Sequence, residues 1–132
     1  MKTINELQDE VIEEFSDFAD WMDKYQLLIA PEYKNDQNLI DGCQSRVWLQ
    51  ADLVDGKVEF QAESDALIVK GIIALLIKVV SGHTPDEILE NELYFIEAIG
   101  LKDHLSPTRS NGLLAMVKQM RMYALAFKAK MA

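Results

Sequence analysis

The residue with the clearest chemical potential is Cys43, the only cysteine among the 132 residues. A single thiol forms no internal disulfide, and it supplies too few ligands for a zinc or iron–sulfur site. Its flanks favour an accessible position: Asp41-Gly42 is a turn signal, and an alternating strand pattern begins at Arg46. A free cysteine is also among the most buried residue types. Its position alone therefore supports a reactive thiol and a packing residue equally.

Few other residues could assist a reactive thiol. Cysteine reacts as a thiolate, and a nearby cation such as Arg46 could lower the thiol pKa, although a surface salt bridge is the more ordinary role of that arginine. His83 and His104 are the two histidines, and either would have to act as general base in a cysteine-dependent hydrolase. For both we expect structural hydrogen bonds instead. Gly-rich phosphate loops and metal-ligand spacings do not occur in the sequence.

Three segments, in order, resemble the SufE family of sulfur acceptors. They are Gly-Cys-Gln-Ser-Arg-Val-Trp at 42–48, Ser-Asp-Ala-Leu-Ile-Val-Lys-Gly-Ile-Ile-Ala-Leu at 64–75 and His-Leu-Ser-Pro-Thr-Arg-Ser-Asn-Gly-Leu at 104–113. Three ordered motifs are far more specific than one short pattern. The chain departs from the family pattern in residues 30–40, where the connection to the Gly-Cys segment is shorter.

The resemblance implies a function. A SufE-like protein takes sulfur from the persulfide of a cysteine desulfurase onto its own cysteine, here Cys43, and stimulates the desulfurase. It then passes the sulfur to an iron–sulfur cluster assembly scaffold complex. The pyridoxal phosphate belongs to the partner desulfurase, so no cofactor is expected on this chain, which acts as an activator more than as an enzyme by itself.

The resemblance also suggests residues that support Cys43 or dock the partner. These are Gly42, Gln44, Ser45, Arg46, Asp65 and Arg109. The alternatives are an adaptor that only docks on a desulfurase and, less favoured, a cysteine-dependent hydrolase. A cluster scaffold of related shape would need further Cys or His ligands.

Composition limits the partners and the compartment. The chain is long enough for one domain, covering 1–132, and its hydrophobic and charged contents of 49% and 27% are those of a globular protein. The net charge is −9, with −7 in residues 1–36, which argues against nucleic-acid and anionic-membrane surfaces. Protein partners are expected, and a homodimer is left open. One unpaired cysteine and no export-signal pattern indicate the cytoplasm.

The N-terminal region has a helical pattern. Thr3 and Glu6 form a capping-box signal, and apolar residues follow at three- and four-residue steps as far as Ile29. This predicts an amphipathic helix, or two helices divided near Ser16-Asp17. Residues 30–40 lose the periodicity and predict an exposed loop.

The middle of the chain predicts an antiparallel hairpin. Two period-2 runs within 46–62 meet at Asp55-Gly56, a strong hairpin-turn signal. The residues before Cys43 could add a third, edge strand. Trp48 falls on the polar face, where cover by a packing helix is expected.

The remaining sequence is helical. Residues 66–80 are apolar almost all round and too short to cross a bilayer, so we expect a buried central helix capped by Ser64 or Asp65. A capping box at 84–87 begins a set of short helices, and a long helix starts at Ser106-Pro107. The predicted fold class is α+β, a small antiparallel sheet covered by several helices, which the resemblance identifies as SufE-like and similar to the iron–sulfur scaffold fold.

Overall fold

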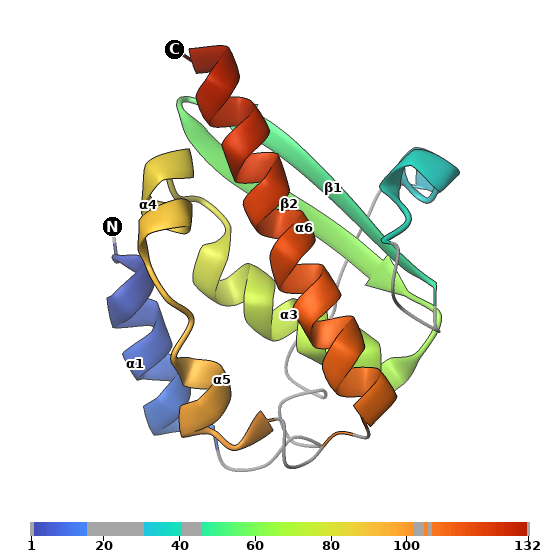
Figure 1. The fold of residues 1–132 in the computed structure, drawn as a ribbon, viewed down its shortest axis with the longest axis vertical. Coiled ribbons are helices and arrows are strands. Elements are labelled where there is room, and N and C mark those ends of the chain that lie inside the picture. The colour runs from blue at the N-terminus through green and yellow to red at the C-terminus, as the bar shows by residue number, and fades with distance from the viewer. Residues whose placement is uncertain (1, 16–30, 41–45, 102–104, 106, 132) are drawn as a thin grey trace.

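A computed structural model describes residues 2–15, 31–40, 46–101, 105 and 107–131. The chain order is helix α1 (Ile4–Glu14), the short 3-10 helices η1 (Pro31–Tyr33) and η2 (Asp36–Asn38), strands β1 (Val47–Val54) and β2 (Lys57–Ser64), and helices α3 (Leu67–Val80), α4 (Pro85–Glu90), α5 (Phe95–Ala98) and α6 (Pro107–Met131). Figure 1 shows helix α3 beside the two-stranded sheet, with the long helix α6 crossing in front of both. The predicted α+β class is confirmed.

The hairpin forms where its turn signal predicts it. Asp55 and Gly56 have φ values of 52° and 78°, and two consecutive positive φ values are what a tight hairpin turn requires. The strands pair in antiparallel register from Val47 with Ser64 to Val54 with Lys57. The hairpin therefore extends two residues beyond the predicted end at residue 62.

A full third strand is not present among the described residues. Leu39 forms an isolated antiparallel bridge with Trp48, and the Ile40 N–H donates to the Val47 carbonyl at 2.9 Å. Helix η2 ends at Asn38, so only two residues are left to run alongside β1 before the described segment stops. Of the predicted edge strand, only this short pairing occurs among the described residues.

Helix α3 is buried against the sheet as its apolar sequence predicts. Residues from Ile72 to Leu76 are almost completely inaccessible, and the helix contacts β2 along its length. The predicted cap is wrong, however: Ala66 is the N-cap residue, and no side chain caps the helix. No helix among the described residues is long and apolar enough to cross a membrane.

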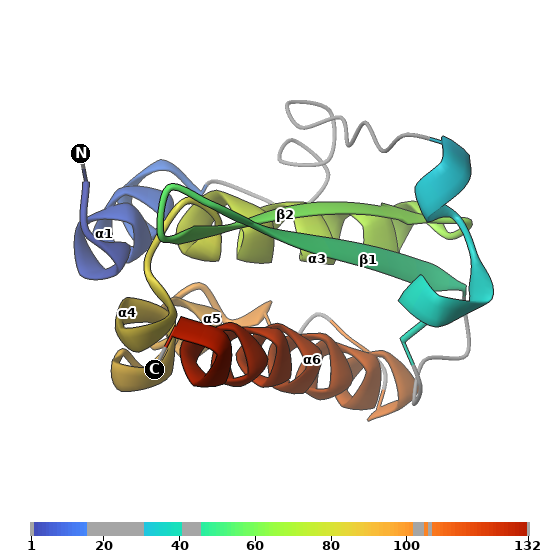
Figure 2. The same ribbon diagram turned by 90° about the horizontal axis from the view of Figure 1, so that it is seen from above.

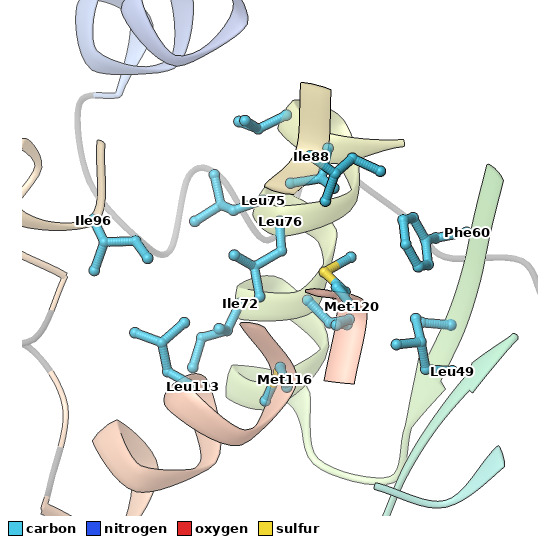
Figure 3. Close-up of a cluster of buried hydrophobic side chains, with 14 of the residues drawn as sticks. Leu49, Phe60, Ile72, Leu75, Leu76, Ile88, Ile96, Leu113, Met116 and Met120 are labelled. Atoms are coloured by element: carbon cyan, nitrogen blue, oxygen red, sulfur yellow. The ribbon is translucent and has the colours of Figure 1, made fainter. Parts of the chain in front are cut away.

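Helix α6 completes the core. Its inner face carries Leu113, Met116 and Met120, each at most 1% exposed. Figure 3 shows Met120 pointing into the space between α3 and the hairpin residues Phe60 and Leu49. Flexible methionine side chains fill irregular gaps between unlike elements, so their core spacing in the sequence is explained by packing.

The two predicted capping boxes are both formed. The Thr3 hydroxyl accepts from the Glu6 N–H at the start of α1, and Thr84 and Glu87 repeat the arrangement at the start of α4. Helix α1 is anchored to the α4–α5 connection by the buried Gln8, whose side chain bonds the Glu92 carbonyl at 2.9 Å and the Phe95 N–H at 3.1 Å. Helix α1 ends at Glu14, and Phe15 is extended, so one continuous helix to Ile29 is wrong and the helix stops close to the alternative division at Ser16-Asp17. Residues 16–29 lie outside the described residues.

Candidate functional site

The residues that flank Cys43 meet at one corner of the sheet. Cys43, Gly42, Gln44 and Ser45 lie outside the described residues, so the description starts from Ile40 on one side and Arg46 on the other. Ile40 is buried and its N–H donates to the carbonyl of Val47, the first residue of β1. The chain therefore leaves this corner after Ile40 and returns to the same corner at Arg46.

The main chain of Arg46 is held by the two residues that end β2 and precede α3. The Asp65 carboxylate accepts from the Arg46 N–H at 3.1 Å, and the Asp65 N–H donates to the Arg46 carbonyl at 3.3 Å. The Ser64 hydroxyl donates to the same carbonyl at 2.9 Å. We call this arrangement of Ser64, Asp65 and Arg46 the corner clamp.

The corner clamp explains why the predicted helix cap is absent. Asp65 directs its carboxylate to Arg46, so it does not accept from the first turn of α3. Ser64 accepts from the Ala66 N–H at 3.2 Å, which holds the turn into α3 but does not reach the helix itself. Two residues that local sequence rules assign to helix capping instead hold a distant segment, the one that leads out of residues 41–45.

The clamp joins two of the residues expected to support Cys43, namely Arg46 and Asp65. Both side chains are exposed at this corner. Arg109 lies in the first turn of α6, and both ribbon views place that turn at the same end of the molecule as the start of β1 (Figures 1 and 2). Its side chain, like His104, lies outside what the structure describes.

Charged side chains next to the corner clamp are paired. The Lys70 ammonium lies 2.8 Å from the Glu63 carboxylate, which joins α3 to the end of β2. Burial opposes ionisation of Glu63, but the hydrogen bonds from Lys70 and from the Ser64 N–H outweigh it, so the pKa of Glu63 lies below its ordinary value. Sequence analysis did not identify this pair, because the partners belong to different elements and meet only across the strand–helix junction.

The connector before Cys43 is more ordered than its sequence suggests. Asn38 is buried, and its side-chain amide donates to the Tyr33 carbonyl at 2.7 Å and to Gln50 at 2.9 Å. Trp48 is buried, and the Lys34 ammonium of this connector lies 4.9 Å from its ring centroid; the expected cover by a packing helix stays a prediction. The predicted exposed loop is confirmed for Glu32 and residues 34–37, which are exposed, whereas Asn38 and Ile40 are buried and two short 3-10 helices replace irregular structure.

His83 has a structural role. It is 2% exposed, and its ring nitrogens lie 3.2 Å from the Val80 carbonyl and 2.9 Å from the Lys2 carbonyl. Its own carbonyl accepts from the Val58 N–H at 2.8 Å, near the turn end of the hairpin and away from the corner clamp. The expected backbone-bonded imidazole is confirmed, and both ring nitrogens are occupied by main-chain groups.

No group of three or more His, Cys, Asp or Glu side chains that could hold a metal ion occurs within the described part of the chain. The corner contains main-chain hydrogen bonds, an exposed arginine and an exposed carboxylate. Such an arrangement can hold the ends of a short segment in place.

Comparisons with known proteins agree with this architecture. The chain is 41% identical over 127 residues to an uncharacterized SufE-like protein of Synechocystis sp. strain PCC 6803, which covers 89% of this chain and 80% of that protein. The solution structure of a hypothetical protein from Thermus thermophilus superposes with a TM-score of 0.71 and 21% identity, over 96% of each chain, and so shares the fold. The model of the SufE family, described as an Fe-S metabolism associated domain, matches residues 9–124. The chain therefore belongs to the SufE family.

Proposed function

We propose that this protein is a sulfur acceptor in iron–sulfur cluster biogenesis, with Cys43 as the residue that carries the sulfur. The observation that carries the proposal is the position of the only thiol in the sequence. Cys43 belongs to a segment whose flanking residues are both held at one corner of the sheet, Ile40 by the Val47 carbonyl and Arg46 by the Asp65 carboxylate. Membership of a family associated with Fe-S metabolism supplies the biological context.

The proposed reaction is transfer of one sulfur atom between thiols. The Cys43 thiolate attacks the terminal sulfur of a persulfide, R–S–SH, on a cysteine desulfurase. The new bond joins the Cys43 sulfur to that terminal sulfur, the S–S bond of the desulfurase persulfide breaks, and its inner sulfur leaves as the thiolate R–S⁻. The products are Cys43–S–SH and R–S⁻, so neither an oxidant nor a cofactor on this chain is needed, and the chemistry follows thiol–disulfide exchange.

The residues around Cys43 have supporting roles in this proposal. Asp65 and Ser64 hold the Arg46 main chain, which limits how far the outgoing end of the reactive segment can move. Gly42, Gln44 and Ser45 belong to that segment, and in this proposal they support Cys43 or dock the partner. The guanidinium groups of Arg46 and Arg109 are candidates for lowering the thiol pKa or for docking the desulfurase.

The downstream step is the same kind of exchange, with Cys43 now donating the sulfur. The Cys43 persulfide is attacked at its terminal sulfur by a thiolate of a cluster-assembly scaffold, and the Cys43 thiolate is regenerated. Because the carrier ends in its starting state, each protein molecule can serve many cycles. The protein accelerates the desulfurase by removing the sulfur that would otherwise remain on its cysteine.

The test is the rate of alanine formation from cysteine by a pyridoxal-phosphate desulfurase of the same organism, with and without this protein. Wild type should raise the steady-state rate in the presence of a reductant that discharges the carrier. Cys43→Ser should give no stimulation, although it should still compete with wild type for the desulfurase. Full stimulation by Cys43→Ser would overturn the carrier role in favour of a docking-only adaptor.

The hydrolase alternative has less support. It needs a histidine within reach of the thiol, and the buried ring of His83 lies against the carbonyls of Val80 and Lys2, near the turn end of the hairpin. Hydrolysis of a small thioester by the isolated protein, lost in both Cys43→Ala and His104→Ala, would contradict this assessment.

A further inference from the structure

The connector that leads toward Cys43 lies on the outer face of strand β1. Trp48 and Gln50 are two positions apart on β1, so their side chains point to the same face of the hairpin. The connector contacts both of them. The Asn38 amide donates to Gln50 at 2.9 Å, and the Lys34 ammonium lies 4.9 Å from the centroid of the Trp48 ring. The connector is therefore seated on this face by two side-chain contacts.

Trp48 holds the connector through its main chain as well as through its ring. Leu39 forms an isolated antiparallel bridge with Trp48, and the next residue, Ile40, donates its N–H to the Val47 carbonyl at 2.9 Å. Lys34 and Leu39 both contact Trp48, so the residues between them form a short loop that is closed on one aromatic residue. The ring contact of Lys34 therefore acts on the same stretch of chain that runs into the segment containing Cys43.

A carboxylate on the neighbouring strand adds to the attraction for Lys34. Glu63 lies directly opposite Trp48 in the strand register, which places its side chain on the same face. Its carboxylate lies 2.8 Å from the Lys70 ammonium. Burial opposes ionisation of Glu63, but the hydrogen bonds from Lys70 and Ser64 and the charges of Lys70 and Lys34 together lower its pKa. The Lys34 ammonium is thus attracted both by an aromatic face and by a carboxylate.

The described anchors of the connector differ in exposure. Asn38 and Ile40 are 8% and 6% exposed, whereas Lys34 is an exposed residue. Breaking a buried contact leaves a polar group without solvent, but an ammonium that leaves the ring is solvated at once. The Lys34 contact is therefore the one of these three that opens at low cost, and its loss loosens the connector without unfolding the domain.

From these contacts we propose that Lys34 is a positioning residue for Cys43. Its ammonium, held on the Trp48 ring, fixes the connector from whose end the chain runs to Cys43, as Asp65 fixes the other side of the same segment at Arg46. Cys43 therefore lies between two exposed side-chain contacts, one before it and one after it. The inference rests on the proposed function, because positioning of this thiol matters for the protein only if Cys43 carries the sulfur.

The first test is the rate at which iodoacetamide alkylates Cys43 in the full chain, followed by intact mass. Lys34→Gln should raise the rate about two- to fivefold, the change in open population that loss of an exposed cation–π contact gives. Lys34→Arg keeps a cation on the ring and should react at the wild-type rate. Each rate is taken from the plateau of its pH profile, where the thiol is fully ionised, so a change in thiolate fraction does not contribute.

Lys130→Gln is the matched control for this test. It removes a second cation–π contact, in which the Lys130 ammonium lies 5.8 Å from the Phe127 ring centroid, near the C-terminal end of α6 and away from the connector. Its alkylation rate should equal that of wild type. A Lys34→Gln rate equal to wild type, or a Lys130→Gln rate raised as much as that of Lys34→Gln, would overturn the inference.

The second test reads the Trp48 ring directly. The sequence has two tryptophans, so Trp21→Phe leaves Trp48 as the single indole. In that background Lys34→Gln should increase the quenching of Trp48 fluorescence by acrylamide, because the ring loses its cover, and Lys34→Arg should not. Circular dichroism checks that each variant is folded. Quenching that Lys34→Gln leaves unchanged would overturn the inference, since the ammonium would then not shield the ring.

Sulfur loading of wild type by a cysteine desulfurase separates this inference from the proposed function. If an active desulfurase places no sulfur on Cys43, the carrier role fails, while alkylation and quenching still decide whether Lys34 positions the thiol. If wild type takes up sulfur but Lys34→Gln changes neither alkylation nor quenching, the positioning role fails and the carrier role stands. We expect sulfur uptake by wild type together with faster alkylation and stronger quenching in Lys34→Gln.

Discussion

The two ends of the hairpin are held by different kinds of clamp. At the Val47–Ser64 end, Ser64 and Asp65 bond the main chain of Arg46, and the side chains of Asp65 and Arg46 are exposed. Near the turn end, the ring nitrogens of His83 lie 3.2 Å from the Val80 carbonyl and 2.9 Å from the Lys2 carbonyl, and the residue is 2% exposed. Both clamps use polar side chains to hold segments that are distant in the sequence.

Burial determines what each clamp contributes. A hydrogen bond lost in the interior leaves a main-chain group without solvent, which costs about 1–3 kcal/mol, whereas water replaces a lost bond at the surface. The His83 clamp therefore stabilises the fold by holding the N-terminal segment against the end of α3. In the corner clamp Ser64 is buried, but the Asp65 contact is exposed and therefore weaker, and it stands next to the segment that contains Cys43.

The largest expected effect is at the buried clamp. His83→Ala should lower the free energy of unfolding by about 2–4 kcal/mol, because it removes both ring contacts and leaves a cavity. Urea denaturation followed by circular dichroism measures this. Glu59→Ala, at an exposed position of the neighbouring strand, is the control and should change stability by less than about 0.5 kcal/mol. Equal effects of the two substitutions would show that the buried contacts of His83 make no special contribution to stability.

An intermediate effect is expected in the connector that approaches Cys43. Asn38→Ala should lower the free energy of unfolding by about 1–2 kcal/mol, since the buried amide holds Tyr33 and Gln50 together. Asn35→Ala removes the exposed cap of η2 and should cost less. A larger loss for Asn35→Ala would mean that the connector is not held mainly by its buried amide.

A smaller effect on stability, but a specific one on reactivity, is expected at the corner clamp. Asp65→Ala should lower the free energy of unfolding by about 1 kcal/mol or less, because the contact is exposed. It should also speed alkylation of Cys43 by iodoacetamide several-fold, since the reactive segment loses an anchor. Asp65→Asn keeps an oxygen acceptor for the Arg46 N–H and should alkylate at the wild-type rate. An alkylation rate unchanged in Asp65→Ala would show that the clamp does not restrain Cys43.

The smallest effect is a pH dependence next to the His83 clamp. Burial opposes ionisation of Glu87, but the hydrogen bonds from Thr84 outweigh it and hold the pKa of Glu87 below its ordinary value. The folded state is therefore favoured at a pH above about 4.3, the value for an unfolded glutamate, and this contribution is lost as the pH falls through the lower folded pKa. Glu87→Gln can still form the capping box. It should reduce the loss of unfolding free energy between neutral and acid pH by less than about 1 kcal/mol. An acid limb identical to that of wild type would contradict this assignment.

Local signals in the sequence predicted most of the fold. The capping boxes at Thr3 and Thr84 and the Asp55-Gly56 turn involve residues within a few positions of each other, and each forms as predicted. The failures were at long-range contacts. Asp65 was expected to cap α3 because its local context is that of a cap, but the competing donor is the Arg46 N–H, 19 residues earlier.

The sequence predicted which residues belong to the candidate site but not how they are arranged in space. The resemblance placed Arg46 and Asp65 in one functional group, and the structure brings their main chains together. The sequence did not predict the Glu63–Lys70 pair or the buried Asn38. Those features depend on which faces of separate elements meet, and the spacing of residues along one element does not contain that information.

The central claim, that Cys43 carries sulfur, is tested most directly by intact mass spectrometry. The protein is mixed with the cysteine desulfurase of its organism and free cysteine without reductant, beside a Cys43→Ser control. The account predicts that wild type gains the mass of one or more sulfur atoms, that a reductant removes the gain, and that the control gains nothing. An unmodified wild type in the presence of an active desulfurase would contradict it.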